Sequence, residues 1–320
     1  MKKMGPGKAH RKGISLLELA ERFPTERAAV AWFEGVVWPT GRACGHCGSV
    51  DNYRIKSGKP MPYRCRDCKR YFSVKTGTLM AGSPLPVRKW VYAIYLDVTN
   101  LKGVSSMKLH RDLGVTQKTA WFMQQRVREA FRAKGPMVFA GPVEVDETYI
   151  GGLEKNKHKS KKLGVGGGPG GKVAVVGAKD RDTNKVAAKV IDSTDKATLQ
   201  GFVQKHAAPD AKVYTDDTSA YKSLGNHEAV KHSVGEFVKG MAHTNGMESF
   251  WATLKRAHKG TFHRLSAKHL QRYVNEFAGR HNIRDMDTIR QMEHVVAAMV
   301  GRRLMYRDLI ADNGRSAMAT

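Results

Sequence analysis

Five short runs between residues 143 and 234 constrain the fold of this chain more than any other feature. They read VEVDETYI, KVAVVGAK, NKVAAKVID, AKVYTD and EAVKHSV. Alternating or β-branched apolar residues bounded by turn residues are typical of strands. A helical pattern near Lys196–His206 separates the third run from the fourth, and residues 244–307 are mostly helical in pattern. The order predicts an α/β fold with a mixed sheet and helices packed on its faces.

The four cysteines form two C-x₂-C pairs. Cys44 and Cys47 make the first pair, and Cys65 and Cys68 the second, with 17 residues between them. This spacing is typical of a four-cysteine zinc ribbon, in which each pair supplies two ligands to one tetrahedral ion. A redox-active cysteine pair is the less favoured alternative, since it would not need a second C-x₂-C pair. Gly48 follows the first pair, where a knuckle turn requires a positive φ. A closed site of four protein ligands predicts a structural Zn²⁺ ion.

The chain is strongly basic, which indicates a polyanionic partner. Lys and Arg number 55 against 29 Asp and Glu, for a formal net charge of +26 over 320 residues. Solubility requires far less charge, whereas neutralisation of phosphates with counterion release drives binding to nucleic acid. The sequence has no secretory signal pattern and no apolar stretch approaching about 20 residues. We expect a cytoplasmic, DNA-associated protein without a membrane partner.

Several helices are expected outside the predicted sheet. A capping box at Ser15–Glu18 opens a short helix, a second helix covers about 26–37, and a third covers about 87–99. Residues 105–113, 114–116 and 117–131 have helix–turn–helix proportions. The apolar stripe of the last segment leaves these residues for solvent or DNA: Gln117, Lys118, Thr119, Gln124 and Arg128. An ordinary helical hairpin packed on its neighbours is the alternative interpretation.

A Lys- and Gly-rich segment follows the first predicted strand. KNKHKSKKLGVGGGPGGK, residues 155–172, cannot bury a core, and we expect a mobile loop that is ordered by phosphate contact. Lys161, Lys162 and Lys172 are its candidate DNA-binding residues. Its Gly-x₄-Gly-Lys pattern ends in Val173 rather than Ser or Thr, so it lacks the hydroxyl that a P-loop places on Mg²⁺.

Three acidic residues stand apart from the basic background: Asp146, Asp216 and Glu248. The first two lie where apolar, β-branched runs end, and the third lies in a helical pattern. Carboxylates are preferred ligands of Mg²⁺, and two ions about 4 Å apart can activate a nucleophile and stabilise a leaving oxygen. Alternation places Glu144 and Asp146 on one strand face, opposite Val143 and Val145. The pattern alone cannot decide which of Glu144, Asp146 and Glu147 is the functional carboxylate. The same ambiguity applies to Asp216 and Asp217.

The chain resembles insertion-sequence transposases of the DDE type from bacteria, in the subgroup with an N-terminal zinc ribbon. The resemblance covers most of the chain and is carried by RFPTERAAVAWFEGVVWPTG, LGVTQKTAWFMQQRVREA, VEVDETYIGG, VYTDDTSAY and TNGMESFWATLKRAHKGTFHRLSAKHLQRYVNEFAGRHN. The last block is long and specific. The first knuckle departs from the pattern, since Gly45 stands where such ribbons often carry proline.

The resemblance implies a ribonuclease-H-like catalytic fold with Asp146, Asp216 and Glu248 as the catalytic, metal-binding triad. Asn245 is an alternative or supporting ligand. The implied activity is cleavage of transposon ends and transfer of the 3′-hydroxyls into target DNA, with two Mg²⁺ or Mn²⁺ ions, double-stranded DNA as partner and a homo-oligomer in the synaptic complex. The alternatives are a structure-selective nuclease on the same fold and a catalytically silent zinc-ribbon regulator that binds DNA.

The helical pattern also places cations near the predicted site. Lys255 follows Glu248 by seven residues, nearly two turns, so both project from one helix face toward phosphate. Arg256 is a further candidate DNA contact. The domains expected are an N-terminal helical segment (1–40), the zinc ribbon (41–80), a helix–turn–helix-like region (81–138), the catalytic domain (139–310) and a flexible tail (311–320).

Overall fold

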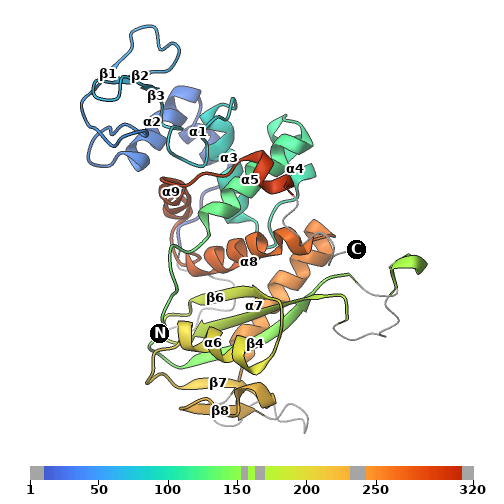
Figure 1. The fold of residues 1–320 in the computed structure, drawn as a ribbon. Coiled ribbons are helices and arrows are strands. Elements are labelled where there is room, and N and C mark those ends of the chain that lie inside the picture. Colours follow the sequence, from blue (N-terminus) through green and yellow to red (C-terminus); the bar gives the residue numbers. More distant parts are fainter. Residues whose placement is uncertain (1–10, 153–157, 163–169, 231–242, 312–320) are drawn as a thin grey trace. The chain divides into compact units, whose positions relative to one another are not determined.

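The computed structural model describes residues 11–152, 158–162, 170–230 and 243–311 (Figure 1). The chain divides into two compact units. The helical unit contains Met1–Phe131 and Ile283–Ala311, and the sheet unit contains Arg132–Asn282. Most of the Lys- and Gly-rich segment lies outside the described residues. None of the described helices is long and apolar enough to cross a bilayer.

The helical unit begins with the expected helices α1 (Leu16–Arg22) and α2 (Glu26–Val37). Ser15 and Glu18 form the predicted capping box, in which the Ser15 hydroxyl accepts from the Glu18 N–H and the Glu18 carboxylate accepts from the Ser15 N–H. The predicted third helix is α3 (Val87–Thr99). These helices share one apolar core around the fully buried Trp90.

The zinc ribbon is a three-stranded antiparallel sheet of order β1-β2-β3. Its strands are β1 (Asn52–Arg54), β2 (Tyr63–Cys65) and β3 (Tyr71–Phe72). Tyr63 and Phe72 are buried against Trp38, at ring centroid distances of 5.8 and 6.0 Å. The Tyr63 hydroxyl donates to Glu34 at 2.6 Å. The small sheet is therefore tied to the end of α2.

The expected helix pair is α4 (Ser106–Leu113) and α5 (Gln117–Ala130), joined through Gly114 at a left-handed φ of 56°. The predicted apolar stripe of α5 is buried, but two of its polar residues are not free for solvent or DNA. Gln124 is 5% exposed and donates to the Val104 carbonyl, and Arg128 is 1% exposed. The prediction for these two was wrong because the polar side of α5 is covered as well.

The C-terminal part of the chain supplies part of this cover. Helices α9 (Thr288–Ala298) and α10 (Tyr306–Ile310) belong to the helical unit, whereas the sequence pattern placed residues 139–310 in one catalytic domain. Arg302, between them, donates to the carbonyls of Glu129 and Ala130 at the end of α5. The helical unit is thus closed by residues far away in sequence.

The sheet unit has the predicted α/β architecture, and a strand is present at each of the five predicted runs, although residues 231–234 of the fifth run lie outside the described residues. The strands are β4 (Val143–Ile150), β5 (Val173–Asp180), β6 (Val186–Ile191), β7 (Val213–Asp216) and β8 (His227–Val230), in the order β6-β5-β4-β7-β8. The first three strands in sequence pair antiparallel, and β7 and β8 are parallel to β4. The fold is consistent with a ribonuclease-H-like transposase domain.

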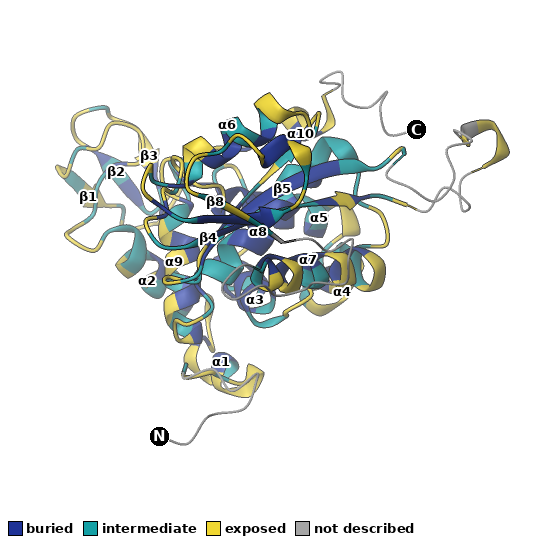
Figure 2. Cartoon of the chain, turned by 90° about the horizontal axis from the view of Figure 1, so that it is seen from below, coloured by how far each residue is buried: buried dark blue, intermediate teal, exposed yellow. Residues whose placement is uncertain are grey.

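Helices cover both faces of this sheet. Val143 and Val145 pack with α6 (Lys196–His206) on one face. On the other face, α7 (Asn245–Ala257) and α8 (Ala267–Asn282) bury apolar side chains against β5 and β6. A π-helical turn (His258–Phe262) follows α7, and short 3-10 turns occur at Lys159–Lys161 and Ser219–Tyr221. Figure 2 shows the buried central strands between these layers.

Candidate functional site

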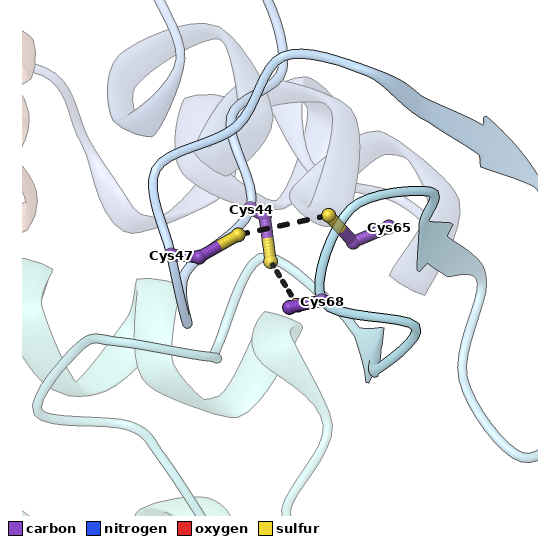
Figure 3. A group of neighbouring side chains, drawn as sticks. All are labelled: Cys44, Cys47, Cys65 and Cys68. Atoms are coloured by element: carbon purple, nitrogen blue, oxygen red, sulfur yellow. Dashed lines mark hydrogen bonds between the residues drawn. The ribbon is translucent and has the colours of Figure 1, made fainter.

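The four cysteines converge at one point of the ribbon (Figure 3). The Sγ atoms of Cys44 and Cys68 are 3.7 Å apart, as are those of Cys47 and Cys65. Two thiolates bound tetrahedrally to Zn²⁺ at about 2.3 Å are separated by about 3.8 Å. The four sulfurs, all within 4.8 Å of one another, fit a structural zinc ion without rearrangement.

The backbone of the ribbon favours the metal-binding form of one cysteine, Cys65. The backbone N–H of Cys68, with a second N–H from Asp67, lowers the pKa of the Cys65 thiol to about 7. Thiolates are the ligand form of cysteine. Gly48 has the expected positive φ, 80°. At Gly45 a Cβ atom would lie 2.3 Å from the Thr76 carbonyl oxygen, so this tight approach explains glycine where related ribbons often have proline.

Asp146 and Asp216 lie on neighbouring parallel strands of the sheet unit. β4 and β7 pair in parallel with Glu144 opposite Tyr214, and Asp146 and Asp216 each lie two residues beyond this pair on their strands. Asp216 ends β7, as predicted. Asp146 is instead the fourth of eight residues in β4, which continues to Ile150 because its partner β5 is equally long. Asp146 therefore follows the apolar part of the predicted strand but lies within the strand rather than at its tip.

Glu248 lies in the first turn of α7, the helix that crosses the face of the sheet carrying Asp146. Both Glu248 and Lys255 are exposed on this helix. Phe250 and Trp251, on its other side, are 4% and 3% exposed and pack in the core of the unit, as expected. The helix thus divides into a core side and a side that carries Glu248 and Lys255.

The three acids share one electrostatic environment. Burial and, to a smaller extent, the charges of Asp216 and Glu248 raise the pKa of Asp146 to about 6, against a hydrogen bond from the Glu147 N–H that lowers it. Among the described residues, no Lys or Arg forms an ion pair with any of the three. Asp216 Oδ1 is buried and has no hydrogen-bond partner there. An unpaired buried carboxylate beside two like charges is an arrangement that a divalent cation would stabilise.

The structure distinguishes the neighbouring carboxylates that the pattern left open. Both oxygens of Glu144 are already engaged, one by Arg181 and one by the Met247 N–H. Burial raises the pKa of Glu147 to about 7, and its Oε2 atom is buried near the Tyr221 hydroxyl without a direct hydrogen bond among the described residues. Sequence reasoning gave no signal for Arg181, and it assigned no role to Tyr221 although this residue ends the segment VYTDDTSAY.

The residues fit Mg²⁺ or Mn²⁺ by donor chemistry, since these ions prefer carboxylate oxygens. The cysteines are the only described group in which three or more ligand atoms of His, Cys, Asp or Glu lie within 4.8 Å of one another. The acids therefore stand further apart than the ligands of one compact site. A pair of ions about 4 Å apart spans a larger region and does not require all the oxygens to meet.

The predicted DNA-binding residues occupy separate surfaces of the two units. Gln117 and Lys118 are exposed at the start of α5, where Gln117 donates to Ser106 and Lys118 lies 4.7 Å from the centre of the Tyr306 ring. In the sheet unit the predicted contacts are Lys162, Lys255 and Arg256, all exposed, and Lys172, which is half-buried. The side chain of Lys161 lies outside the described residues.

The ribbon exposes a row of aromatic and cationic side chains that the sequence analysis did not single out. Tyr53 pairs with Arg64 and Arg64 with Tyr71 across the three strands, so the three side chains share one face. Arg64 lies 5.2 Å from the Tyr71 ring centre, and Arg66 lies 5.5 Å from that of Tyr53. Both tyrosines are 36% exposed. Stacking on aromatic rings orders guanidinium groups that can bind phosphate.

Comparisons with known proteins agree with this architecture. Residues 138–282 match the ISXO2-like transposase domain, and residues 24–71 match the transposase zinc-ribbon domain. A protein in transposable element ISH50 of Halobacterium salinarum is 28% identical over 275 residues, which cover 82% of this chain and 92% of that protein. The first match covers nearly all of the sheet unit, and the second covers α2 and most of the ribbon. The chain therefore carries a region similar to the ISXO2-like transposase domain, preceded by one similar to the transposase zinc-ribbon domain.

Proposed function

We propose that this transposase cleaves transposon ends and transfers the freed 3′-hydroxyls into target DNA, with Asp146, Asp216 and Glu248 as its catalytic carboxylates. The observation that carries the proposal is that Asp146 and Asp216 lie on adjacent parallel strands, near enough for the charges of Asp216 and Glu248 to raise the pKa of Asp146, and that none of the three acids has a cationic partner among the described residues. In a chain of net charge +26, unpaired acids at one place favour a cation site over a structural role.

Two Mg²⁺ or Mn²⁺ ions bound there would lower the pKa of the attacking water or 3′-hydroxyl and stabilise the leaving oxygen. Asp146 and Asp216 present their oxygens from the rigid sheet, which limits their motion. Glu248 completes the set from α7. Lys255, two helical turns further on, binds the phosphate backbone and holds the reacting strand beside the carboxylates.

DNA ends are held by surfaces outside the catalytic carboxylates. We propose that the Tyr53–Arg64–Tyr71 face of the ribbon and the start of α5 contact end DNA, while Lys162, Lys172 and Arg256 add contacts that do not depend on sequence. Residues 41–80 contain nine Lys and Arg against two Asp, a balance suited to duplex phosphates. A homo-oligomer would bring the two transposon ends together.

A strand-transfer assay tests the proposal. Labelled, pre-cut end DNA is incubated with target plasmid and Mg²⁺, and joined products are separated by electrophoresis. Wild type is expected to form joined product, and Asp146→Asn is expected to form none while retaining end binding. Asp192→Asn, an exposed acid just after β6, is the matched control and should join DNA as wild type does.

The same assay discriminates the other activities. Hydrolysis of branched DNA without joined product would favour a structure-selective nuclease on this fold. Salt-sensitive DNA binding without turnover in Mg²⁺ or Mn²⁺ would favour a DNA-binding regulator. Joining by Asp146→Asn at the wild-type rate would refute the assignment of the carboxylates.

A further inference from the structure

The helix that carries Glu248 lacks a cap of its own. Thr244, at the N-cap position of α7, makes no side-chain hydrogen bond to the first turn. The first turn of a helix leaves backbone N–H groups that need acceptors. Glu144 Oε2, on β4, accepts from the N–H of Met247 at 3.0 Å. Glu144, which lies 103 positions before Met247 in the chain, therefore caps α7. The N–H group that it binds belongs to the residue directly before Glu248.

The same carboxylate is fixed from its other side. Arg181, just after β5, donates from Nε to Glu144 Oε1 at 2.8 Å and from an Nη atom to the His243 carbonyl at 2.6 Å. His243 Nδ1 lies 3.4 Å from Glu144 Oε1. The Arg181 guanidinium also stacks 4.2 Å from the centre of the Tyr214 ring on β7. Glu144, 2% exposed, thus joins strands β4, β5 and β7 to the start of α7.

Two glycines allow α7 to approach the sheet this closely. A Cβ atom on Gly246 would lie 2.6 Å from Glu144 Oε2. A Cβ atom on Gly177, in β5, would lie 2.4 Å from Met247 Cε and 2.8 Å from the Trp251 ring. The contact leaves no room for the helix start to move toward the sheet, while the hydrogen bond from Met247 holds it against moving away.

We infer that Glu144 is a positioning residue that sets the place of Glu248 relative to Asp146, through the N–H of Met247 and the ion pair with Arg181. The inference rests on the proposed metal-binding role of these acids. Glu144 shares a strand face with Asp146, yet it does not bind metal because its two oxygens are used. Helix α7 and strand β4 therefore deliver their carboxylates as one preorganised unit.

The test measures metal affinity and end cleavage together. Mn²⁺ binding to the protein–DNA complex is followed by the electron paramagnetic resonance signal of free Mn²⁺, alongside the Mg²⁺ concentration for half-maximal cleavage and the Tm. Loss of a residue that orients ligands typically costs 10–100-fold in metal affinity or activity. For Glu144→Gln we expect about 10-fold weaker Mn²⁺ binding, a matching rise in the Mg²⁺ requirement, and recovery of cleavage at saturating metal.

The controls separate positioning from folding. Glu228→Gln, an exposed strand residue paired with Lys212, should leave Mn²⁺ affinity unchanged. Arg181→Lys keeps the positive charge but cannot donate to Glu144 and the His243 carbonyl at the same time, as the guanidinium does. We expect this variant to stay folded and to bind Mn²⁺ more weakly, which keeps the test possible if Glu144→Gln unfolds. Wild-type Mn²⁺ affinity in a folded Glu144→Gln or Arg181→Lys protein would overturn the inference. If wild type binds Mn²⁺ without joining DNA, the proposed function fails and the inference stands.

Discussion

The carboxylate of Asp146 lies close enough to that of Asp216 for the charge of Asp216 to raise its pKa, which burial and the neighbouring acids together bring to about 6. Like charges on adjacent strands oppose folding of the metal-free protein, and no Lys or Arg among the described residues pairs with them. Sites that bind or react often keep such unfavourable groups at a cost in stability. Function and stability therefore make opposite demands on this residue.

Replacing Asp146 with Asn should remove activity without loss of stability. The substitution eliminates a buried charge next to Asp216 and Glu248, so we expect a Tm at or above that of wild type in EDTA, together with the loss of end cleavage. Differential scanning fluorimetry and a gel-based cleavage assay measure the two properties. A marked fall in Tm would show that the Asp146 charge stabilises the fold, contrary to its placement here.

Zinc removal should unfold the ribbon. Cys65 is fully buried, and the apolar cluster of the ribbon contains only a few residues, so the metal supplies much of its folding energy. We expect one zinc per chain by elemental analysis, and its loss in Cys65→Ser with a drop in Tm. His46→Asn is the control: His46 hydrogen-bonds the Tyr71 carbonyl rather than a metal, so this variant should retain one zinc. A zinc-free protein with an unchanged ribbon would refute the structural role.

The exposed ribbon face should contribute to DNA binding through Arg64. Arg64→Ala is expected to weaken binding of end DNA several-fold and to reduce the salt slope by about one, as for the loss of one phosphate contact. Fluorescence anisotropy at several salt concentrations provides the measurement. Lys56→Ala, an exposed cation in the β1–β2 turn, should change binding less. Equal losses in both variants would indicate a diffuse charge effect rather than this face.

The substitution Gly177→Ala should displace α7. Since the added Cβ would approach Met247 and Trp251 to less than 3 Å, overpacking is expected to cost about 1–3 kcal/mol. End cleavage should fall further than stability alone explains, because Glu248 moves with the helix. Chemical denaturation and the cleavage assay test this. Gly201→Ala on α6, where a Cβ would meet nothing within 4 Å, should leave both properties intact or slightly raise stability.

His206 should make the sheet unit sensitive to mild acid. Burial beside Phe202 lowers its pKa, and the charges of Lys189 and Lys205 act in the same direction, against its hydrogen bond to the Met137 carbonyl. Above pH 6.5 the imidazole is neutral in both folded and unfolded chains. Below this value the unfolded chain binds the proton first, so the free energy of unfolding falls as the pH falls.

Urea denaturation of wild type and His206→Gln at pH 7 and pH 5 isolates this contribution. Other histidines titrate in both proteins, so the difference between them reports on His206. The advantage of wild type should shrink between pH 7 and pH 5. A constant difference over this range would contradict the lowered pKa.

Much of the fold could be predicted because its strands and its zinc ribbon depend on patterns between residues that are close in sequence. Alternation identified all five strands and the faces of Val143 and Glu144, and cysteine spacing predicted a zinc ribbon whose four sulfurs meet in the structure. These features depend on neighbours in sequence. A strand has only two faces, and a zinc knuckle needs only two cysteines at the right spacing and a turn.

Tertiary structure alone decided which polar residues are free to act. Arg128 was expected on the surface but is buried, and the last turn of α5 is joined to Arg302, from the distant C-terminal part of the helical unit. Glu144 and Asp146 look equivalent along one strand face. Only the partners of Glu144, 37 and 103 residues away, show that it supports the helix of Glu248, because hydrogen bonds between distant segments leave no periodic trace in a sequence.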